Sequence, residues 1–424
     1  MLNSYYKNYK AEAWDILQYL FKVKRINDHT LHFIAEFSGK LDLDKLSKTI
    51  DMSINFFPLI RCRYNESKRQ PYWEEAGYTA SDIIEFVEIR NGNEECVKQY
   101  LYQQIDAFNG PQLNIKLIRV EEKDTLCILM SHMLCDAAGF KEYLYMLCNI
   151  YSNIENNQDY QVIPRKNRKI KQILKNVSIT EKAKIMFSKV DIFTYDDVKF
   201  ELEGDLSNPF IEIRTINKEK FSMLKVYAKE HDATINDIML TAYIRVLFEL
   251  FGRCVTIPCT VDLRKYLPNH RGECFCNLCT NLICNIGNET GKTFEETLYK
   301  VKKEMNKQKS NIACIKSIAM LEKVFDIFPY KIARGIVEKK FVNPPIAFTN
   351  IGIIDEKQLT FGETNIIEAY MTGSIKYDPY FQLAISTFNN VATLSVNLYG
   401  TQSDKNKVNI FLDKFINELQ ASVY

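Results

Sequence analysis

A polar and charged stretch divides the chain into two parts of similar length. From about Tyr151 to Ser207 the sequence has no long apolar alternation, whereas both flanking parts contain strand-like and helix-like segments. The chain has 424 residues, which is more than one hydrophobic core usually supports. We therefore expect two lobes, residues 1–190 and 208–424, with a charged linker over about 151–207.

In the first part, apolar residues either alternate as in strands or recur at helical spacing. These patterns predict strands at 31–39, 58–64, 113–120 and 125–130, with the last two forming a hairpin, and helices at 41–57 and 141–154. Leu46, Ile50 and Ile54 form one stripe of the first helix, and Pro58 ends it.

The second part repeats this mixture of strands and helices. Thr234 and Asp237 have the spacing of a helix N-terminal capping box, an apolar stripe follows, and Gly252 suits a C-terminal cap. The patterns predict strands at 210–216, 254–264, 279–287, 345–352, 381–390 and 391–400, and helices at 218–231 and 233–252. An α/β (α+β) protein, with a mixed sheet and helices in each lobe, is the expected class.

The segment SHMLCDAAGF, residues 131–140, places His132 directly after an apolar strand and Asp136 four positions later. A neutral imidazole at the start of a loop can accept a proton near neutral pH, as a general base must. Asp136 could orient this ring or brace the loop through a cationic partner. The alternative is a histidine that is simply satisfied by hydrogen bonds at a strand end.

The segment resembles the His-His-x-x-x-Asp-Gly motif of the condensation-domain and chloramphenicol-acetyltransferase-like acyltransferase superfamily. Ser131 replaces the first histidine and Ala137 the glycine, while His132 and Asp136 match. Further resemblances follow in the family's order: an opening strand-helix-strand unit, the Asn-Asp helix, the Asp-Leu-Arg segment of the alcohol-acetyltransferase and wax-ester-synthase branches, and a strand beside the site, at 37–64, 234–247, 258–268 and 348–352.

The resemblance implies two chloramphenicol-acetyltransferase-like lobes in a V around a central tunnel. It implies that His132 deprotonates the acceptor, and that Asp136 is structural and pairs with Arg61. A buried carboxylate needs such a partner, although Arg61 could equally be a solvated strand residue. Gly139 would let the loop pass close to another backbone, or would form a plain turn.

Other positions of the motifs have two readings each. In the family, the segment of Asp262 and Arg264 supports the active-site face and the contact between lobes; a surface ion pair is the alternative. Thr349 and Asn350 lie where the family has polar groups facing the tunnel, so they could stabilise an oxyanion or merely cap a strand. Ser131 is a further candidate for an oxyanion or substrate contact.

The implied reaction moves an acyl group from a thioester to a hydroxyl or amine acceptor without a metal or redox cofactor. Acyl coenzyme A is the expected donor. Two alternatives stay open. One is a free-standing condensation enzyme that takes its donor from an acyl carrier protein and forms an amide, which a basic rim from residues 165–184 would favour. The other is a non-catalytic binding or scaffold protein of the same fold.

Composition excludes other classes. The net charge of +2 is not the strong basic excess that is typical of proteins that bind nucleic acid. The N-terminus lacks the apolar core of a signal peptide, no stretch is long enough to span a membrane, and twelve cysteines without an export signal indicate reduced thiols. We therefore expect a cytoplasmic, monomeric protein.

Two further segments invite rival interpretations. Cys274, Cys276, Cys279 and Cys284 lie close together and could hold zinc or an iron-sulfur cluster. Their spacing matches none of the usual frameworks, so packing as small hydrophobes is the preferred interpretation. The amphipathic, partly basic segment 315–341 could touch a membrane surface or could cover a sheet.

Overall fold

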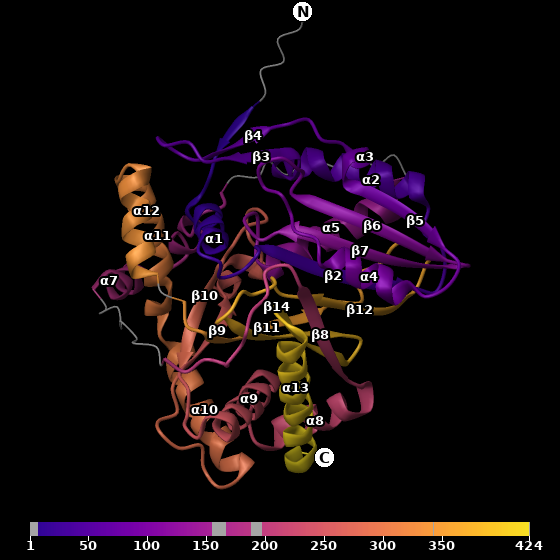
Figure 1. The fold of residues 1–424 in the computed structure, drawn as a ribbon. Helices are drawn as coiled ribbons and strands as arrows, with labels where there is room; N and C mark the ends of the chain where they lie inside the picture. Colours follow the sequence, from indigo (N-terminus) through magenta and orange to yellow (C-terminus); the bar gives the residue numbers. More distant parts are fainter. Residues whose placement is uncertain (1–6, 155–166, 188–196, 342, 424) are drawn as a thin grey trace, which may run out of the picture.

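The computed structural model describes residues 7–154, 167–187, 197–341 and 343–423. Two mixed sheets form the framework, and their helices lie mainly on opposite sides of the molecule (Figure 1). The first sheet has the strand order β12-β2-β7-β6-β5, and the second β10-β9-β11-β13-β14-β8. A small third sheet, β1-β4-β3, lies beside the first.

Most of the predicted helices and strands are present with small shifts of their bounds, and the structure has further helices and strands that were not predicted. The strands of the first sheet are β2 (Thr30–Phe37), β5 (Ile84–Ile89), β6 (Leu113–Val120), β7 (Lys123–Ser131) and β12 (Ile366–Thr372); those of the second are β8 (Pro209–Ile216), β9 (Ile257–Asp262), β10 (Cys279–Cys284), β11 (Ile346–Ile354), β13 (Phe381–Phe388) and β14 (Val391–Tyr399); the small sheet has β1 (Asn8–Lys10), β3 (Cys62–Asn65) and β4 (Tyr72–Glu75). The helices are α1 (Ala13–Val23), α2 (Leu43–Phe56), α3 (Ala80–Ile83), α4 (Asn93–Leu101), α5 (Ala137–Asn153), α6 (Lys171–Leu174), α7 (Ile179–Phe187), α8 (Lys218–Glu230), α9 (Ile235–Phe251), α10 (Phe294–Ser310), α11 (Lys316–Ile327), α12 (Tyr330–Lys340) and α13 (Gln402–Val423).

Strand β7 is apolar along most of its length because both of its faces are covered. Ile128 packs into the core that contains Phe140 of α5, whereas Leu129 packs into a separate cluster with Val97 of α4. A strand covered on both sides is expected to read as a continuous apolar run. This position in the middle of the sheet carries the end of β7, and therefore His132, into the interior.

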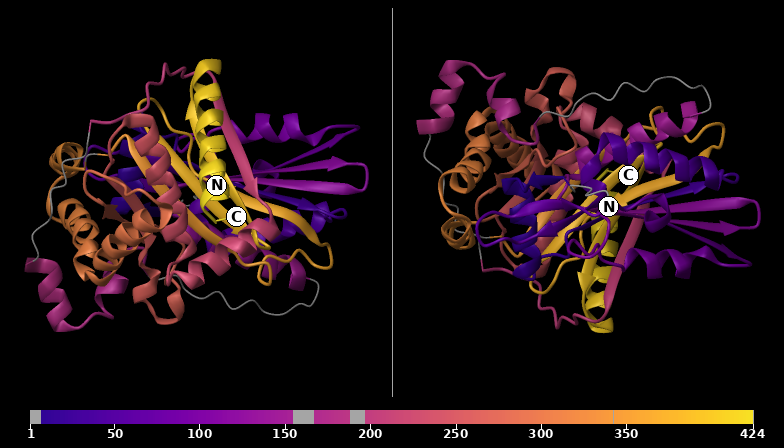
Figure 2. Two further views of the ribbon diagram at one scale, coloured as in Figure 1. Left: turned by 90° about the horizontal axis from the view of Figure 1, so that it is seen from below. Right: turned by 90° about the horizontal axis from the view of Figure 1, so that it is seen from above.

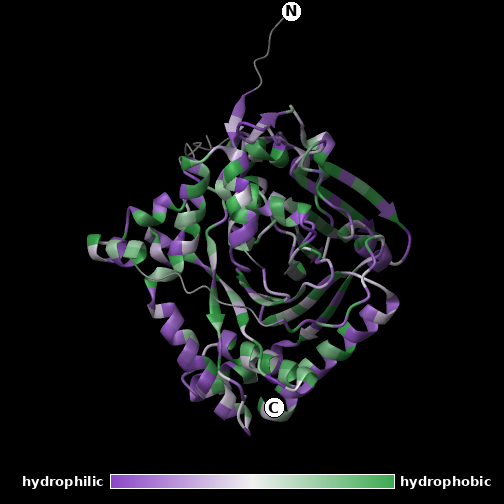
Figure 3. Cartoon of the chain, turned by 60° about the vertical axis from the view of Figure 1, so that its left-hand side comes forward, coloured by the Kyte–Doolittle hydropathy of each residue, from purple (hydrophilic) through white to green (hydrophobic). Residues whose placement is uncertain are grey.

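The second sheet is covered on its outer face by α8, α9, α10 and α13, which form one core with it. The predicted capping box of α9 is present, since Thr234 accepts from the Asp237 amide and Asp237 accepts from the Thr234 amide. Gly252 ends α9 in the left-handed conformation with φ 68°, as predicted. Hydrophobic and hydrophilic residues alternate along the helices, as expected of helices with one buried face (Figure 3).

The two lobes are not two continuous halves of the chain. Strand β12, from the second half, pairs with β2 and so completes the first sheet. The pair α11–α12 also lies beside α1 at one side of the molecule (Figures 1 and 2). The predicted division at 190 and 208 therefore does not account for these two insertions into the first lobe.

Two other expectations need correction or restriction. The predicted strand 58–64 begins with a 3-10 turn, Pro58–Arg61, and β3 starts at Cys62. Proline fixes a φ that suits the first position of such a turn.

Part of the expected linker, 155–166 and 188–196, lies outside the described residues. Among the residues described, no helix has both the length and the apolar character needed to cross a bilayer.

Candidate active site

The loop after β7 is short and held at both ends. Ser131 ends the strand, and Asp136 is the N-cap of α5, accepting a hydrogen bond of 2.8 Å from the Gly139 amide. The backbone amide of His132 donates to the His29 carbonyl oxygen at 2.8 Å, which ties the loop to the start of β2. Four residues, 132–135, therefore span the distance from strand to helix with little freedom.

The ring of His132 is oriented by its own loop. Its Nδ1 lies 3.0 Å from the carbonyl oxygen of Cys135. A carbonyl oxygen can accept a hydrogen bond but cannot donate one, so Nδ1 must carry the proton. In the neutral ring, Nε2 then holds the lone pair. His132 as a whole residue is half-buried, whereas Ser131 and Met133 on either side of it are buried.

The surroundings keep this ring neutral. Burial lowers the pKa of His132 below its ordinary value, and the Lys376 charge lowers it further, while the Asp136 charge opposes both. Protonation of the ring in this position would add a second cation beside Lys376 in a region of low dielectric. The ring therefore meets the two requirements of a general base: a free lone pair and a neutral resting state.

Asp136 is oriented away from this chemistry. It is 5% exposed, and its oxygens accept from the Gly139 amide, from the Leu278 amide at 2.7 Å and from the guanidinium of Arg264. Burial alone would raise the pKa of Asp136, but the charge and hydrogen bonds of Arg264 and the two amides outweigh it, so this pKa lies below its ordinary value. Asp136 is a fixed anion that braces the loop.

The partner of Asp136 is Arg264 and not Arg61, which corrects the expectation. Arg264 Nη2 lies 3.0 Å from Asp136 Oδ1 and Nη1 lies 3.1 Å from Oδ2, and the arginine is 2% exposed. Arg61 instead forms an ion pair with Glu75 of β4. Arg61 ends a 3-10 turn that precedes β3, and β3 pairs with β4, so the local sheet supplies its partner.

Arg264 connects the lobes through several groups at once. It follows β9 in the second sheet, and besides Asp136 it reaches Asp262 Oδ1 at 3.0 Å, Glu142 Oε1 at 3.2 Å and the Cys276 carbonyl at 2.8 Å. Asp262 also accepts from the backbone amide of Arg264. The expected supporting role of the Asp-Leu-Arg segment therefore has a structural basis, and a simple surface pair does not describe it.

Gly139 allows this contact to form. A Cβ at position 139 would lie 2.9 Å from both Cys135 Cβ and the Cys276 carbonyl oxygen, and 3.1 Å from Arg264 Nη2. The expected close approach of another backbone is confirmed. The approaching backbone belongs to the cysteine-containing segment of the second lobe.

That segment, residues 274–279, forms one wall of the site. The Asn277 side chain donates to the carbonyl oxygen of His132 at 3.0 Å, and the Leu278 amide donates to Asp136. Burial raises the pKa of Cys276 and Cys279, which disfavours the thiolate that a metal ligand requires. No group of three or more metal-ligating side chains occurs among the described residues.

The remaining predicted residues have other surroundings. Ser131 is 0% exposed and its hydroxyl has no hydrogen-bond partner, and its expected contact with an oxyanion or substrate stays a prediction. Asn350 contacts Asn236 of α9 at 3.2 Å and caps the Gly352 amide within the bulge of β11. Thr349 pairs with Ala384 in the sheet. Lys141 of α5 donates to the Ile351 carbonyl, so this strand lies beside the helix that Asp136 caps.

Sequence reasoning missed four supporting residues, because none belongs to a motif. They are His29, Asn277, Lys376 and Arg168, the last of which donates to the Leu134 carbonyl at 2.9 Å while paired with Asp15. The pair formed by Arg168 and Asp15 thus contacts the loop at a second point, the Leu134 carbonyl. Within its basic run, nothing in the sequence distinguishes Arg168 from the neighbouring lysines and arginines.

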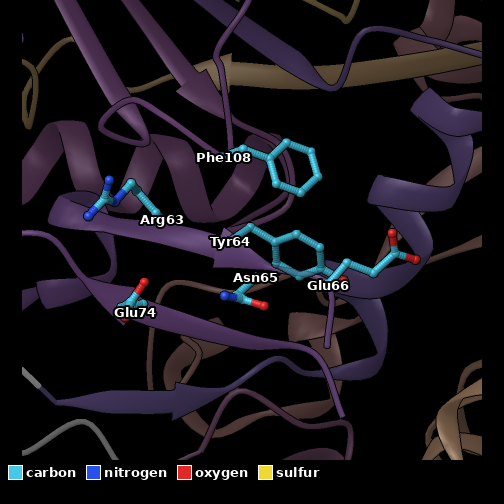
Figure 4. A pocket seen from close by; sticks show the side chains of 6 residues that line it. All are labelled: Arg63, Tyr64, Asn65, Glu66, Glu74 and Phe108. Carbon is cyan, nitrogen blue, oxygen red and sulfur yellow. The ribbon is translucent and has the colours of Figure 1, made fainter. Parts of the chain in front are cut away.

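Two cavities lie outside the loop of His132. One, of ≈370 Å³, is lined by Arg63, Tyr64, Asn65, Glu66, Glu74 and Phe108 (Figure 4). The other, of ≈270 Å³, lies between α1 and the α11–α12 pair. In the first cavity Glu66 accepts from Tyr330 and Arg334, so its charge is already balanced by α12.

Solved structures share this architecture. No family model and no curated protein matches the sequence. The first condensation domain of the CDA synthetase matches with a TM-score of 0.69 and 11% identity, over 99% of this chain and 97% of that chain. The trichothecene 15-O-acetyltransferase from Fusarium sporotrichioides has values of 0.71 and 13%, over 98% and 95%.

A third similar structure is that of polyketide synthase associated protein 5 from Mycobacterium tuberculosis. Its TM-score is 0.65 at 13% identity, over 97% of each chain. The chain thus has the two-lobed fold of the condensation-domain and chloramphenicol-acetyltransferase-like superfamily, as its motifs predicted.

The different surroundings of the two arginines give a first prediction. Arg264→Met leaves Asp136 buried without its counter-ion, and we expect it to lower the free energy of unfolding by about 3–5 kcal/mol. Arg61→Met removes the half-exposed partner of Glu75 and should lower the free energy of unfolding by no more than about 1 kcal/mol. Urea unfolding followed by circular dichroism measures both. Equal losses would contradict the assignment of Arg264 as the partner.

A second prediction concerns Gly139. Gly139→Ala forces a methyl group against Cys135 and the Cys276 carbonyl, so we expect a loss of about 1–3 kcal/mol in unfolding free energy. Gly335→Ala is the matched control. Gly335 lies inside α12 with nothing within 4 Å of the added Cβ, and this change should stabilise by about 0.5–1 kcal/mol. A Gly139 variant as stable as the native protein contradicts the close approach.

Proposed function

We propose that the protein is an acyltransferase in which His132 deprotonates a hydroxyl or amine acceptor as it attacks an acyl thioester. One observation carries the proposal: Nδ1 of a neutral histidine is committed to the Cys135 carbonyl, so Nε2 of this half-buried residue is left with a lone pair. The fold supports it, since condensation domains and an acetyltransferase share this architecture.

The proposed chemistry needs one proton carrier and no external co-reactant beyond the two substrates. Nε2 takes the proton of the acceptor while the acceptor oxygen or nitrogen forms a bond to the thioester carbonyl carbon. The tetrahedral oxyanion then collapses, the carbon–sulfur bond breaks, and the imidazolium returns the proton to the leaving thiolate. His132 ends each cycle neutral, with its Nδ1 hydrogen bond to Cys135 unchanged.

Asp136 acts in this scheme as a positioning residue. Its oxygens are occupied by Arg264 and by the amides of Gly139 and Leu278, so it does not relay a proton from the ring. Its negative charge still favours the imidazolium that forms during the reaction. Thr349 and Asn350 of β11 remain candidates to stabilise the oxyanion.

Coenzyme A thioesters are the donors that we propose first. A carrier-protein thioester is the second candidate, supported by the likeness to condensation domains and by exposed lysines of α6 and α7, namely Lys171, Lys182 and Lys184. Arg168 and Lys169 of the same basic run are already paired with Asp15 and Asp326. Incubation with acetyl coenzyme A and with acetylated carrier protein in parallel distinguishes the donors.

The proposal predicts a specific effect of removing the base. His132→Ala should reduce acyl transfer by about 10²–10⁴-fold, because general base catalysis contributes an effect of that size. His270→Ala, which removes an exposed histidine, should leave the rate unchanged. Intact mass spectrometry of acceptor pools with acetyl, medium-chain and long-chain thioesters gives the readout. Full transfer in His132→Ala would sink the mechanism, and a scaffold protein would show no transfer at all.

The lowered pKa of His132 predicts the pH profile. The neutral ring is the active form, so kcat/KM should be constant above the pKa in the folded protein and fall as the ring protonates at lower pH. Because burial and Lys376 depress this pKa, the acid limb should lie below pH 6.5. Steady-state rates from pH 4.5 to 8 measure it. An acid limb above pH 7 would contradict a depressed pKa.

A further inference from the structure

The segment between β12 and β13 reaches the loop of His132 from the second lobe. Its backbone at Lys376 is fixed on β14: the Lys376 amide donates to the Asn397 carbonyl at 2.9 Å, and its carbonyl accepts from the Tyr399 amide at 2.8 Å. These hydrogen bonds determine where the lysine side chain starts. The backbone position of Lys376 is therefore set by the second sheet.

The same segment is bonded to the residues that support His132. The Asp28 amide donates to the Ile375 carbonyl at 3.0 Å, and the Ile375 amide returns a hydrogen bond to Asp28 Oδ1 at 3.0 Å. The next residue, His29, accepts from the His132 amide. Ile375, which directly precedes Lys376, and His132 are therefore bonded to adjacent residues, Asp28 and His29, just before β2.

The ammonium of Lys376 has no counter-ion at bonding distance. Among the described residues its Nζ makes no ion pair and no hydrogen bond, although the side chain is half-buried. The other buried cations near the site differ in this respect. Lys141 donates to two carbonyl oxygens, and Arg168 and Arg264 are paired with aspartates. Lys376 thus retains a positive charge without a bonded partner, and this charge acts on His132 by lowering its pKa.

Asp28 is the acidic group whose charge acts on Lys376, but the two form no ion pair. Asp28 is fully buried, its Oδ1 accepts from the Thr30 and Ile375 amides, and its Oδ2 has no hydrogen-bond partner. Burial raises the pKa of Asp28 to about 7 and lowers that of Lys376 to about 8, and each charge partly opposes the shift of the other. A charge buried without a partner is unfavourable, and an anion arriving from solvent would relieve it.

We propose that Lys376 binds a carboxylate of the substrate and thereby holds the reacting group next to His132. This inference rests on the proposed function and specifies its substrate class: one substrate carries a carboxylate close to the reacting atom. The carboxylate belongs either to the acceptor, as in a hydroxy or amino acid, or to the acyl group of the donor, as in a dicarboxylic monothioester.

Lys376 would be a specificity-determining residue in either case. A site that pairs a buried cation with a substrate anion discriminates strongly against the neutral analogue, because the cation is then left unpaired. We expect a preference of about 10–100-fold for each carboxylate over its uncharged counterpart. Lys376 carries no proton in the proposed reaction and affects the proton transfers only through its charge, which lowers the pKa of His132.

Equilibrium binding tests the carboxylate preference without any turnover. For the acceptor, calorimetric titration of the whole protein compares the affinities for L-lactate, L-serine and β-alanine with those for their amides. For the donor, it compares succinyl coenzyme A with butyryl coenzyme A. His132→Ala serves as the binding protein, so that no acyl transfer occurs. A preference of tenfold or more in one arm, reduced to near unity by the additional change Lys376→Met, supports the proposal.

The controls separate recognition from structure. Lys376→Arg keeps the charge and should keep most of the preference, and Lys357→Met, at an exposed position, should keep all of it. Binding of the carboxylate should weaken as the pH rises through about 8, where Lys376 loses its proton. In an active enzyme, Lys376→Met should also move the acid limb of kcat/KM upward, because it removes a cation that lowers the pKa of His132.

Failure here is distinguishable from failure of the proposed function. Equal binding of acids and neutral analogues in both arms overturns the role of Lys376, even if acyl transfer is found. So does a preference that survives Lys376→Met. Conversely, a carboxylate preference that depends on Lys376 supports this binding site even if the protein consumes no thioester. The absence of thioester turnover would contradict only the proposed acyltransferase reaction.

Discussion

The buried ion pair of Asp136 and Arg264 is the contact on which the site depends. Removing two charges from water is costly, so such a pair is favourable only when hydrogen bonds occupy the remaining donors and acceptors. Here the Gly139 and Leu278 amides donate to Asp136 and the Cys276 carbonyl accepts from Arg264, while Nε of Arg264 has an ion pair with Glu142 but no hydrogen bond. The pair therefore joins the loop of one lobe, the start of α5 and the wall of the other lobe in a single geometry.

The properties of His132 follow from this arrangement. Once the loop is fixed, the Cys135 carbonyl selects the ring tautomer, and the His29 carbonyl holds the backbone. Burial and Lys376 then keep the ring neutral. Each of these effects is local, but the contacts that produce them come from both lobes. The proposed base thus lies where contacts from the two lobes meet, since Asn277 donates to its carbonyl oxygen and Lys376 acts on its ring.

Periodicity and motif order predicted most of the framework, because helices, strands and caps depend on residues that are close together in the sequence. The capping box of α9 and the hairpin leading to His132 are examples. Pairings between distant residues were not predictable in the same way. Both Arg61 and Arg264 lie in family-like segments, and local sequence does not say which one reaches Asp136. Strand β12 pairs with β2 of the first sheet, and Lys376 follows it in a segment that is bonded to β14, so the places of both depend on topology.

The most direct test of the account is the protonation state of His132 itself. Nitrogen-15 labelling of the five histidines, with His132→Gln to assign the resonance, reports which ring nitrogen carries the proton. At pH 7 we expect a neutral ring protonated at Nδ1, with Nε2 showing the shift of an unprotonated nitrogen. A ring protonated at Nε2, or an imidazolium at this pH, would contradict the assignment of His132 as the base.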